Sequence, residues 1–132
     1  MSRADVDAAL QERLSDAQVT WTPIDQRTKW ELLKKWHEVF PKPFPSMAPY
    51  VRGAKAEQEY FRRPGGRFYL VSQAEGPSYE CSAATLPDLS GCIGTFFVFD
   101  PEFSWTMIFV REDEDEDAFC QFTSRPLERG AL

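Results

Sequence analysis

The first half of the chain carries apolar residues at helical spacing. Residues 2–17 are predicted to form a first helix, capped by Ser2, with a thin apolar stripe of Val6, Ala9, Leu10 and Leu14. Because Pro23 disfavours helical backbone in the residue before it, we expect residues 21–24 to be an extended link. A short third helix over residues 53–63 should end at Pro64-Gly65-Gly66.

The strongest helical pattern covers residues 25–40. Asp25 is placed to cap this helix, and Pro41 ends it. One broad apolar face follows the pattern i, i+1, i+4, i+7 and i+8, and it is made of Leu32, Leu33, Trp36, Val39 and Phe40. We expect this face in the core, followed by a proline-rich loop over residues 41–49.

After residue 66 the pattern changes to runs of β-branched and aromatic residues. Strands are predicted at 67–73, 77–83, 95–99, 103–110 and 118–123, with a tight turn at Asp100-Pro101-Glu102. The expected fold class is α+β: two to three N-terminal helices packed on an antiparallel meander of about four strands formed by the C-terminal half. Residues 1–132 should form one such domain, with residues 125–132 as a flexible tail.

Two of these runs, 95–99 and 103–110, are apolar at successive positions. Such strands are central in a sheet and covered on both faces, or covered by helices on one face and by a partner or a long loop on the other. A homo-oligomeric scaffold is therefore one hypothesis for this chain.

Composition narrows the class of protein. With 42% apolar and 14% aromatic residues, the chain has enough material for a core. Its longest apolar stretches fall well short of the roughly 20 residues that span a bilayer, and residues 1–5 lack the apolar segment of a signal peptide, so we expect a cytosolic protein without a membrane partner. Three unevenly spaced cysteines, Cys81, Cys92 and Cys120, fit no disulfide or metal framework and are predicted to be reduced and buried.

The net charge of −6 comes from a single run of six acids. Without that run, the chain has fifteen acidic and fifteen basic residues. This balance disfavours a nucleic-acid partner. The predicted partner-binding residues are the run itself: Glu112, Asp113, Glu114, Asp115, Glu116 and Asp117.

Six like charges repel one another and remain solvated, so the run should form a hairpin tip. It is either a solvated turn or a negative lobe that steers a basic partner. As a calcium loop it fails twice, because Ala118 replaces the turn glycine and Ser124 replaces the bidentate glutamate. We therefore expect neither a metal nor a cofactor.

Other groups offer little support for catalysis. His37 is the only histidine, so a two-histidine zinc site is excluded, and a Cys–His pair would require the fold to bring a cysteine to it. Arg62, Arg63 and Arg67 surround Gly65-Gly66 without the spacing of a phosphate-binding loop, which favours a charged turn. Trp21 and Trp30 are candidate interaction anchors.

The stretch over residues 67–123 also carries an ordered series of short patterns. These are Asp88-Leu89, Phe97-Val98-Phe99-Asp100, Phe103-Ser104-Trp105-Thr106, Glu112, and Phe119 with Phe122. The series resembles a group of small bacterial α+β domains with a Phe-x-Trp-Thr strand, which is similar to immunity proteins of toxin–immunity pairs. That resemblance implies a small acidic protein that blocks a toxin by binding it.

The leading hypothesis is a non-catalytic cytosolic protein-binding domain, immunity-like, that neutralises a basic partner through the acidic hairpin tip. The alternative is a small-molecule-binding protein or enzyme whose pocket lies between the sheet and the proline-rich loop, with His37 or a cysteine as its polar group.

Overall fold

The computed structural model describes residues 3–40, 49–73 and 76–124. Within them lie three helices, α1 (Arg3–Asp16), α2 (Gln26–Val39) and α3 (Gly53–Phe61). The strands are β1 (Thr20–Ile24), β2 (Val51–Arg52), β3 (Gly66–Ser72), β4 (Ser78–Ala83), β5 (Gly94–Phe99), β6 (Trp105–Arg111) and β7 (Phe119–Ser124). The expected cap at Ser2, the loop over 41–48 and the tail over 125–132 lie outside the described residues.

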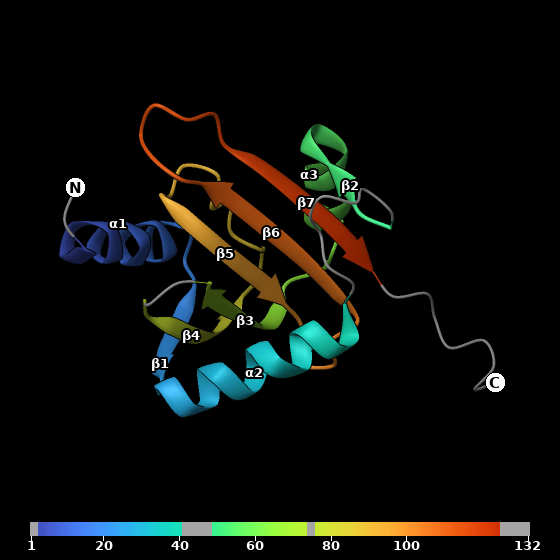
Figure 1. Ribbon diagram of the computed structural model, residues 1–132, viewed down its shortest axis with the longest axis horizontal. Helices are drawn as coiled ribbons and strands as arrows, with labels where there is room; N and C mark the ends of the chain where they lie inside the picture. Colours follow the sequence, from blue (N-terminus) through green and yellow to red (C-terminus); the bar gives the residue numbers. More distant parts are fainter. Residues whose placement is uncertain (1–2, 41–48, 74–75, 125–132) are drawn as a thin grey trace.

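The strands form one antiparallel sheet in the order β1-β4-β3-β5-β6-β7-β2 (Figure 1). The α+β class is right, but the prediction of a meander of about four strands is wrong. The sheet has seven strands, and β5 pairs with β3 instead of with β4, its neighbour in the chain. The C-terminal half does not build the sheet alone either, because β1 and β2 come from the N-terminal half and form its two edges.

The predicted link before α2 is in fact edge strand β1, which pairs with β4 from Thr20↔Ser82 to Ile24↔Ser78. Pro23 is tolerated there because a proline on an edge strand need not donate to a second neighbour. Trp21 is half-buried and packs edge-on against Tyr79, with ring centroids 5.0 Å apart. Of the two candidate interaction anchors, Trp21 therefore packs against the edge of the core, whereas the Trp30 side chain is 53% exposed.

At the other edge, β2 has only two residues, paired as Val51↔Phe122 and Arg52↔Gln121. A segment this short has no periodicity to detect, which explains why the sequence pattern missed it. It leads directly into α3, whose first residue, Gly53, has a φ of 64°.

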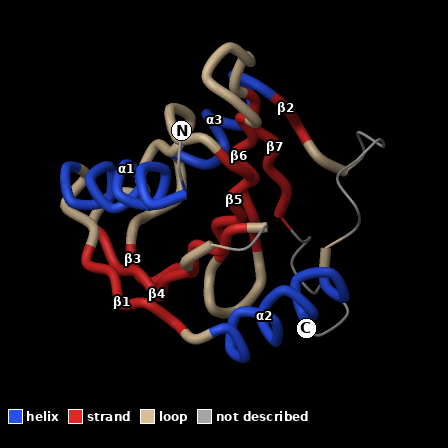
Figure 2. Tube along the Cα trace, turned by 60° about the vertical axis from the view of Figure 1, so that its left-hand side comes forward, coloured by secondary structure: helices blue, strands red, loops and turns tan. Residues whose placement is uncertain are grey.

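Helices cover both faces of the sheet (Figure 2). On one face, Leu10 and Leu14 of α1 and Tyr60 of α3 join a hydrophobic cluster with side chains from the strands. On the other, α2 packs through Leu33, Trp36 and Phe40. All positions of β6 from Trp105 to Val110 are buried, which confirms that this strand is covered on both sides. Because the chain's own helices provide the cover, these apolar strands require no second copy.

Helix α2 begins as predicted. The Asp25 carboxylate accepts a hydrogen bond from the Thr28 N–H at 2.7 Å, and this bond holds the pKa of Asp25 below its ordinary value of 3.8. The predicted apolar face is confirmed, although it also includes Lys29, which is fully buried and donates from Nζ to the Gly76 carbonyl at 3.2 Å. None of the helices in the described residues is long and apolar enough to cross a membrane.

We expect Asp25→Ala to lower the melting temperature near neutral pH and to have a smaller effect in acid. A carboxylate whose pKa is depressed by folding stabilises the protein above its unfolded pKa and loses that contribution as the pH falls through the folded value. Thermal unfolding of both proteins from about pH 7 to about pH 3 checks this expectation. A difference in melting temperature that stays constant across this range would contradict it.

Candidate functional site

The acidic run lies where the pattern predicted, in the connection between β6 and β7. These strands pair from Trp105↔Ser124 to Val110↔Phe119, so residues 112–118 form the tip of a hairpin. All seven residues of this tip are exposed. Within the described residues, no salt bridge joins any of the six carboxylates to a cation. The tip therefore presents its full negative charge to solvent.

Hydrogen bonds order this acidic tip. The Arg111 guanidinium donates to the main-chain carbonyls of Asp113 at 3.3 Å and Glu114 at 2.8 Å. The Asp113 carboxylate accepts from the Asp115 N–H at 2.8 Å. Because Arg111 binds carbonyls and not carboxylates, it shapes the loop and leaves the acids available to a partner.

A hollow of about 350 Å³ lies between the acidic tip and α1. Glu112, Asp113, Glu114 and Asp115 form one wall, and half-buried Val6 and Ile93 supply apolar surface. A smaller hollow beside it also contains Val6 and Ile93, together with Thr95 and Phe96 of β5. The acids thus border a concave surface with an apolar floor, a combination that suits a basic side chain with an aliphatic stem.

The described residues contain no group of three or more His, Cys, Asp or Glu side chains placed to hold a metal ion. Asp113, Asp115 and Asp117 stand at alternate positions, as the first ligands of a calcium loop do. In this structure, however, no three of the hairpin acids are placed to hold one metal ion.

His37 and the three cysteines lie on opposite sides of the sheet. His37 is exposed on α2 and touches the Trp36 ring edge-on, with centroids 5.1 Å apart. All three cysteines are free and buried, as predicted, and they belong to the cluster under α1 and α3. A Cys–His pair is therefore not formed among the described residues.

Burial also makes the thiols poor nucleophiles. It raises the pKa of Cys81 to about 12 and that of Cys120 to about 11, and it raises the pKa of Cys92 as well. Since the thiolate is the reactive form, burial disfavours reaction at these cysteines near neutral pH.

No protein-family model, curated protein or solved structure matches this chain. The functional reading consequently rests on its surfaces. The acidic hollow is one of these surfaces, and a cleft beside Trp105, which the sequence did not predict, is another.

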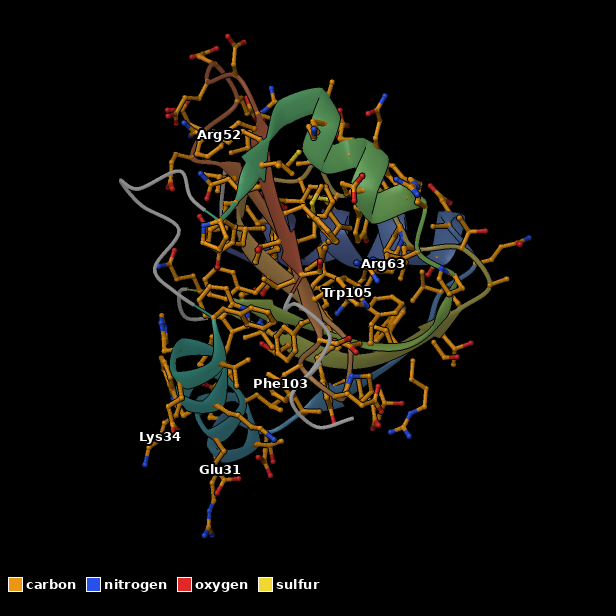
Figure 3. All side chains as sticks on the ribbon, turned by 90° about the vertical axis from the view of Figure 1, so that its right-hand side faces the viewer. Glu31, Lys34, Arg52, Arg63, Phe103 and Trp105 are labelled. Atoms are coloured by element: carbon orange, nitrogen blue, oxygen red, sulfur yellow. The ribbon has the colours of Figure 1, made fainter. Side chains whose placement is uncertain are left out.

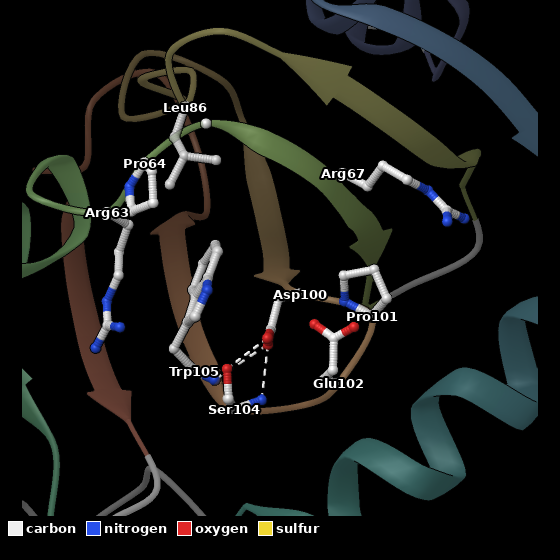
Figure 4. A pocket seen from close by; sticks show the side chains of 10 residues that line it. Arg63, Pro64, Arg67, Leu86, Asp100, Pro101, Glu102, Ser104 and Trp105 are labelled. Atoms are coloured by element: carbon white, nitrogen blue, oxygen red, sulfur yellow. Dashed lines mark hydrogen bonds between the residues drawn. The ribbon is translucent and has the colours of Figure 1, made fainter. Parts of the chain in front are cut away.

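The second hollow is a cleft of about 430 Å³ at the opposite end of β5 and β6 from the acidic tip (Figure 4). Its walls come from the α3–β3 turn with Arg63, from Leu86, and from the β5–β6 turn, and Trp105 lies between them. In Figure 3, Arg63 and Trp105 lie close together beneath α3, whereas Glu31 and Lys34 of α2 point away from the body of the molecule. Pro49 is the only described residue of the proline-rich loop, and it lines a different hollow, of about 320 Å³, together with Val51 of β2 and Phe122 of β7.

The three arginines of the predicted charged turn have different surroundings. Arg62 pairs with Glu59 at 3.1 Å, and Arg67 pairs with Glu80 at 2.6 Å, which raises the pKa of Arg67. Arg63 forms no salt bridge within the described residues, and its guanidinium lies over the Phe122 ring, 5.4 Å from the centroid. It is the arginine available to an anion.

One buried polar group lies apart from both hollows. The Gln121 amide on β7 is fully buried, and neither its oxygen nor its nitrogen has a hydrogen-bond partner in the part of the chain that the structure describes. Gln121 lines neither the acidic hollow nor the cleft beside Trp105.

Proposed function

We propose that this chain is a non-catalytic binding protein that captures a basic protein partner through its acidic hairpin tip. The observation that carries the proposal is the arrangement of six exposed carboxylates, without cationic partners among the described residues, on an ordered tip that borders a hollow with apolar surface. Concentrated charge of one sign accelerates association and orients the partner, and an adjacent apolar surface adds contact area.

A more specific form of the proposal is an immunity-like role. It is supported by the resemblance of the strands around Phe97–Asp100 and Phe103–Thr106 to immunity domains, and by the acidic character of the tip. In this form the partner is a basic toxin, and binding blocks it. Three unpaired, buried cysteines fit a reducing compartment, so we place this role in the cytosol.

The test compares two triple variants with the same change in net charge. The hairpin variant carries Glu112→Gln, Glu114→Gln and Glu116→Gln, and the control carries Glu12→Gln, Glu31→Gln and Glu38→Gln at exposed positions on α1 and α2. A partner captured from lysate of the source organism by the wild-type chain is purified, and its association rate with each protein is measured at several salt concentrations.

We expect the hairpin variant to associate about tenfold more slowly at low salt, with a flatter salt dependence, while the control stays near wild type. Equal rates for both variants would contradict a role for the tip. For the immunity-like form, the captured partner should be toxic when expressed alone and harmless when expressed with the wild-type chain. If the captured partner is not toxic, the immunity-like form is wrong. The rate measurements then still test whether the acidic tip binds a partner.

A further inference from the structure

The cleft beside Trp105 has the features of a preformed ligand site. Its volume of about 430 Å³ falls in the range of small-molecule pockets. Its lining combines the half-buried Pro101 and the largely buried Trp105 and Leu86 with the side chain of Arg63. A pocket of this kind orients a ligand through one polar group while its apolar walls supply contact area.

Both walls of the cleft are rigid. On one side, the Asp100 carboxylate accepts hydrogen bonds from the Ser104 N–H at 2.7 Å and the Trp105 N–H at 3.1 Å, and also from the Ser104 hydroxyl (Figure 4). On the other, Gly65 packs so tightly on the chain at residues 83–84 that a Cβ there would lie 2.1 Å from the Ala84 carbonyl oxygen. Rigid walls reduce the entropy that binding would cost.

The charges in the cleft indicate where an anion binds. Asp100 is occupied by its own turn, and Arg67 by Glu80. Of the two arginines that line the cleft, Arg63 has no ion pair with any described residue, and its guanidinium lies over the Phe122 ring. That ring in turn stacks on Trp105, with centroids 6.2 Å apart, so Phe122 contacts both the guanidinium and the indole.

The acids in the cleft favour a singly charged ligand. Figure 4 shows Arg63 on one side of Trp105 and the carboxylates of Asp100 and Glu102 on the other. A phosphate dianion bound at Arg63 would be repelled by these two acids about twice as strongly as a carboxylate bound at the same place. A guanidinium binds a carboxylate through two parallel hydrogen bonds, which are among the stronger polar contacts in proteins.

We propose that this cleft binds a small aromatic monocarboxylate, whose carboxylate accepts hydrogen bonds from Arg63 and whose ring packs against Trp105. The site is independent of the proposed function, because it lies at the opposite end of β5 and β6 from the acidic tip.

The experiment is a titration of the full chain with benzoate, followed through the indole N–H signal of Trp105 in a ¹H–¹⁵N correlation spectrum. Substituting each of the four tryptophans by Phe assigns the four indole signals. We expect a saturable shift of the Trp105 signal with benzoate and none with acetate or benzyl alcohol at the same concentrations. Phenyl phosphate should bind more weakly than benzoate.

Arg63→Gln should weaken benzoate binding at least about tenfold, and Arg63→Lys should give an intermediate loss because it keeps the charge without the planar fork. The matched control is Arg62→Gln, which removes the neighbouring arginine that pairs with Glu59 and should bind benzoate like wild type. The proposal is overturned if benzoate causes no saturable shift in the wild-type chain. Equal affinity in Arg63→Gln, or tighter binding of phenyl phosphate than of benzoate, would overturn it as well.

Discussion

Replacing Trp36 by alanine is expected to destabilise the protein by about 3–5 kcal/mol. Trp36 is fully buried on α2, and its ring stacks on Phe97 with centroids 4.5 Å apart. Its indole N–H donates to the Thr106 hydroxyl at 2.9 Å, and that hydroxyl in turn donates to the Val98 carbonyl at 3.1 Å. Because Thr106 keeps its bond to Val98 in the variant, the loss comes mainly from the cavity.

Urea unfolding followed by circular dichroism measures this loss, and the same helix provides the control. Trp30 is 53% exposed, so Trp30→Ala should change the free energy of unfolding by less than about 1 kcal/mol. Since domains of this size are stable by only about 5–15 kcal/mol, Trp36→Ala should be far closer to unfolding. Similar losses for both variants would mean that α2 does not pack on the sheet through Trp36.

Gly65→Ala should cost about 3 kcal/mol, at the upper end of the usual range for overpacking. The new Cβ would lie 2.1 Å from the Ala84 carbonyl oxygen and 2.3 Å from that of Ala83. Both obstacles are main-chain atoms next to β4, so a change of rotamer cannot relieve the contact. The turn after α3 must therefore move away from the loop that follows β4.

Gly91→Ala is the matched control for this substitution. Its Cβ would lie 2.7 Å from the end of the Arg13 side chain, which can swing aside, so we expect a loss below about 1 kcal/mol. Unfolding of both variants in urea gives the comparison. Equal losses in the two variants would show that the close approach at Gly65 is not a rigid feature of the fold.

The helices and the central strands were predictable because their signals are local. The cap at Asp25 and the apolar spacing of α2 depend on neighbours within a few residues, and the turn at Asp100 depends on its own side chain. The edge strands were not predictable. A two-residue strand such as β2 has no period, and β1 contains a proline, so each is a strand only because an edge of the sheet is available to pair with it.

The acidic tip was predictable from the sequence, whereas the cleft beside Trp105 was not. The acidic tip is contiguous in the chain, so its place on a hairpin follows from flanking strands and from repulsion between like charges. The cleft beside Trp105 draws on residues 63–67, 86 and 100–105. These segments meet because β5 pairs with β3 and not with β4, a choice that residue patterns do not encode.

The sequence by itself determined the α+β class, the approximate position of each helix in the described residues and the location of all the net charge, because each depends on short-range spacing and on charge count. Only the tertiary structure decided which charged side chains form ion pairs. Arg62, Arg63 and Arg67 are close neighbours in the chain, yet two have carboxylate partners while Arg63 faces a cleft. The reason is physical: an ion pair forms only within a few ångströms, and the packing of strands and turns sets those distances.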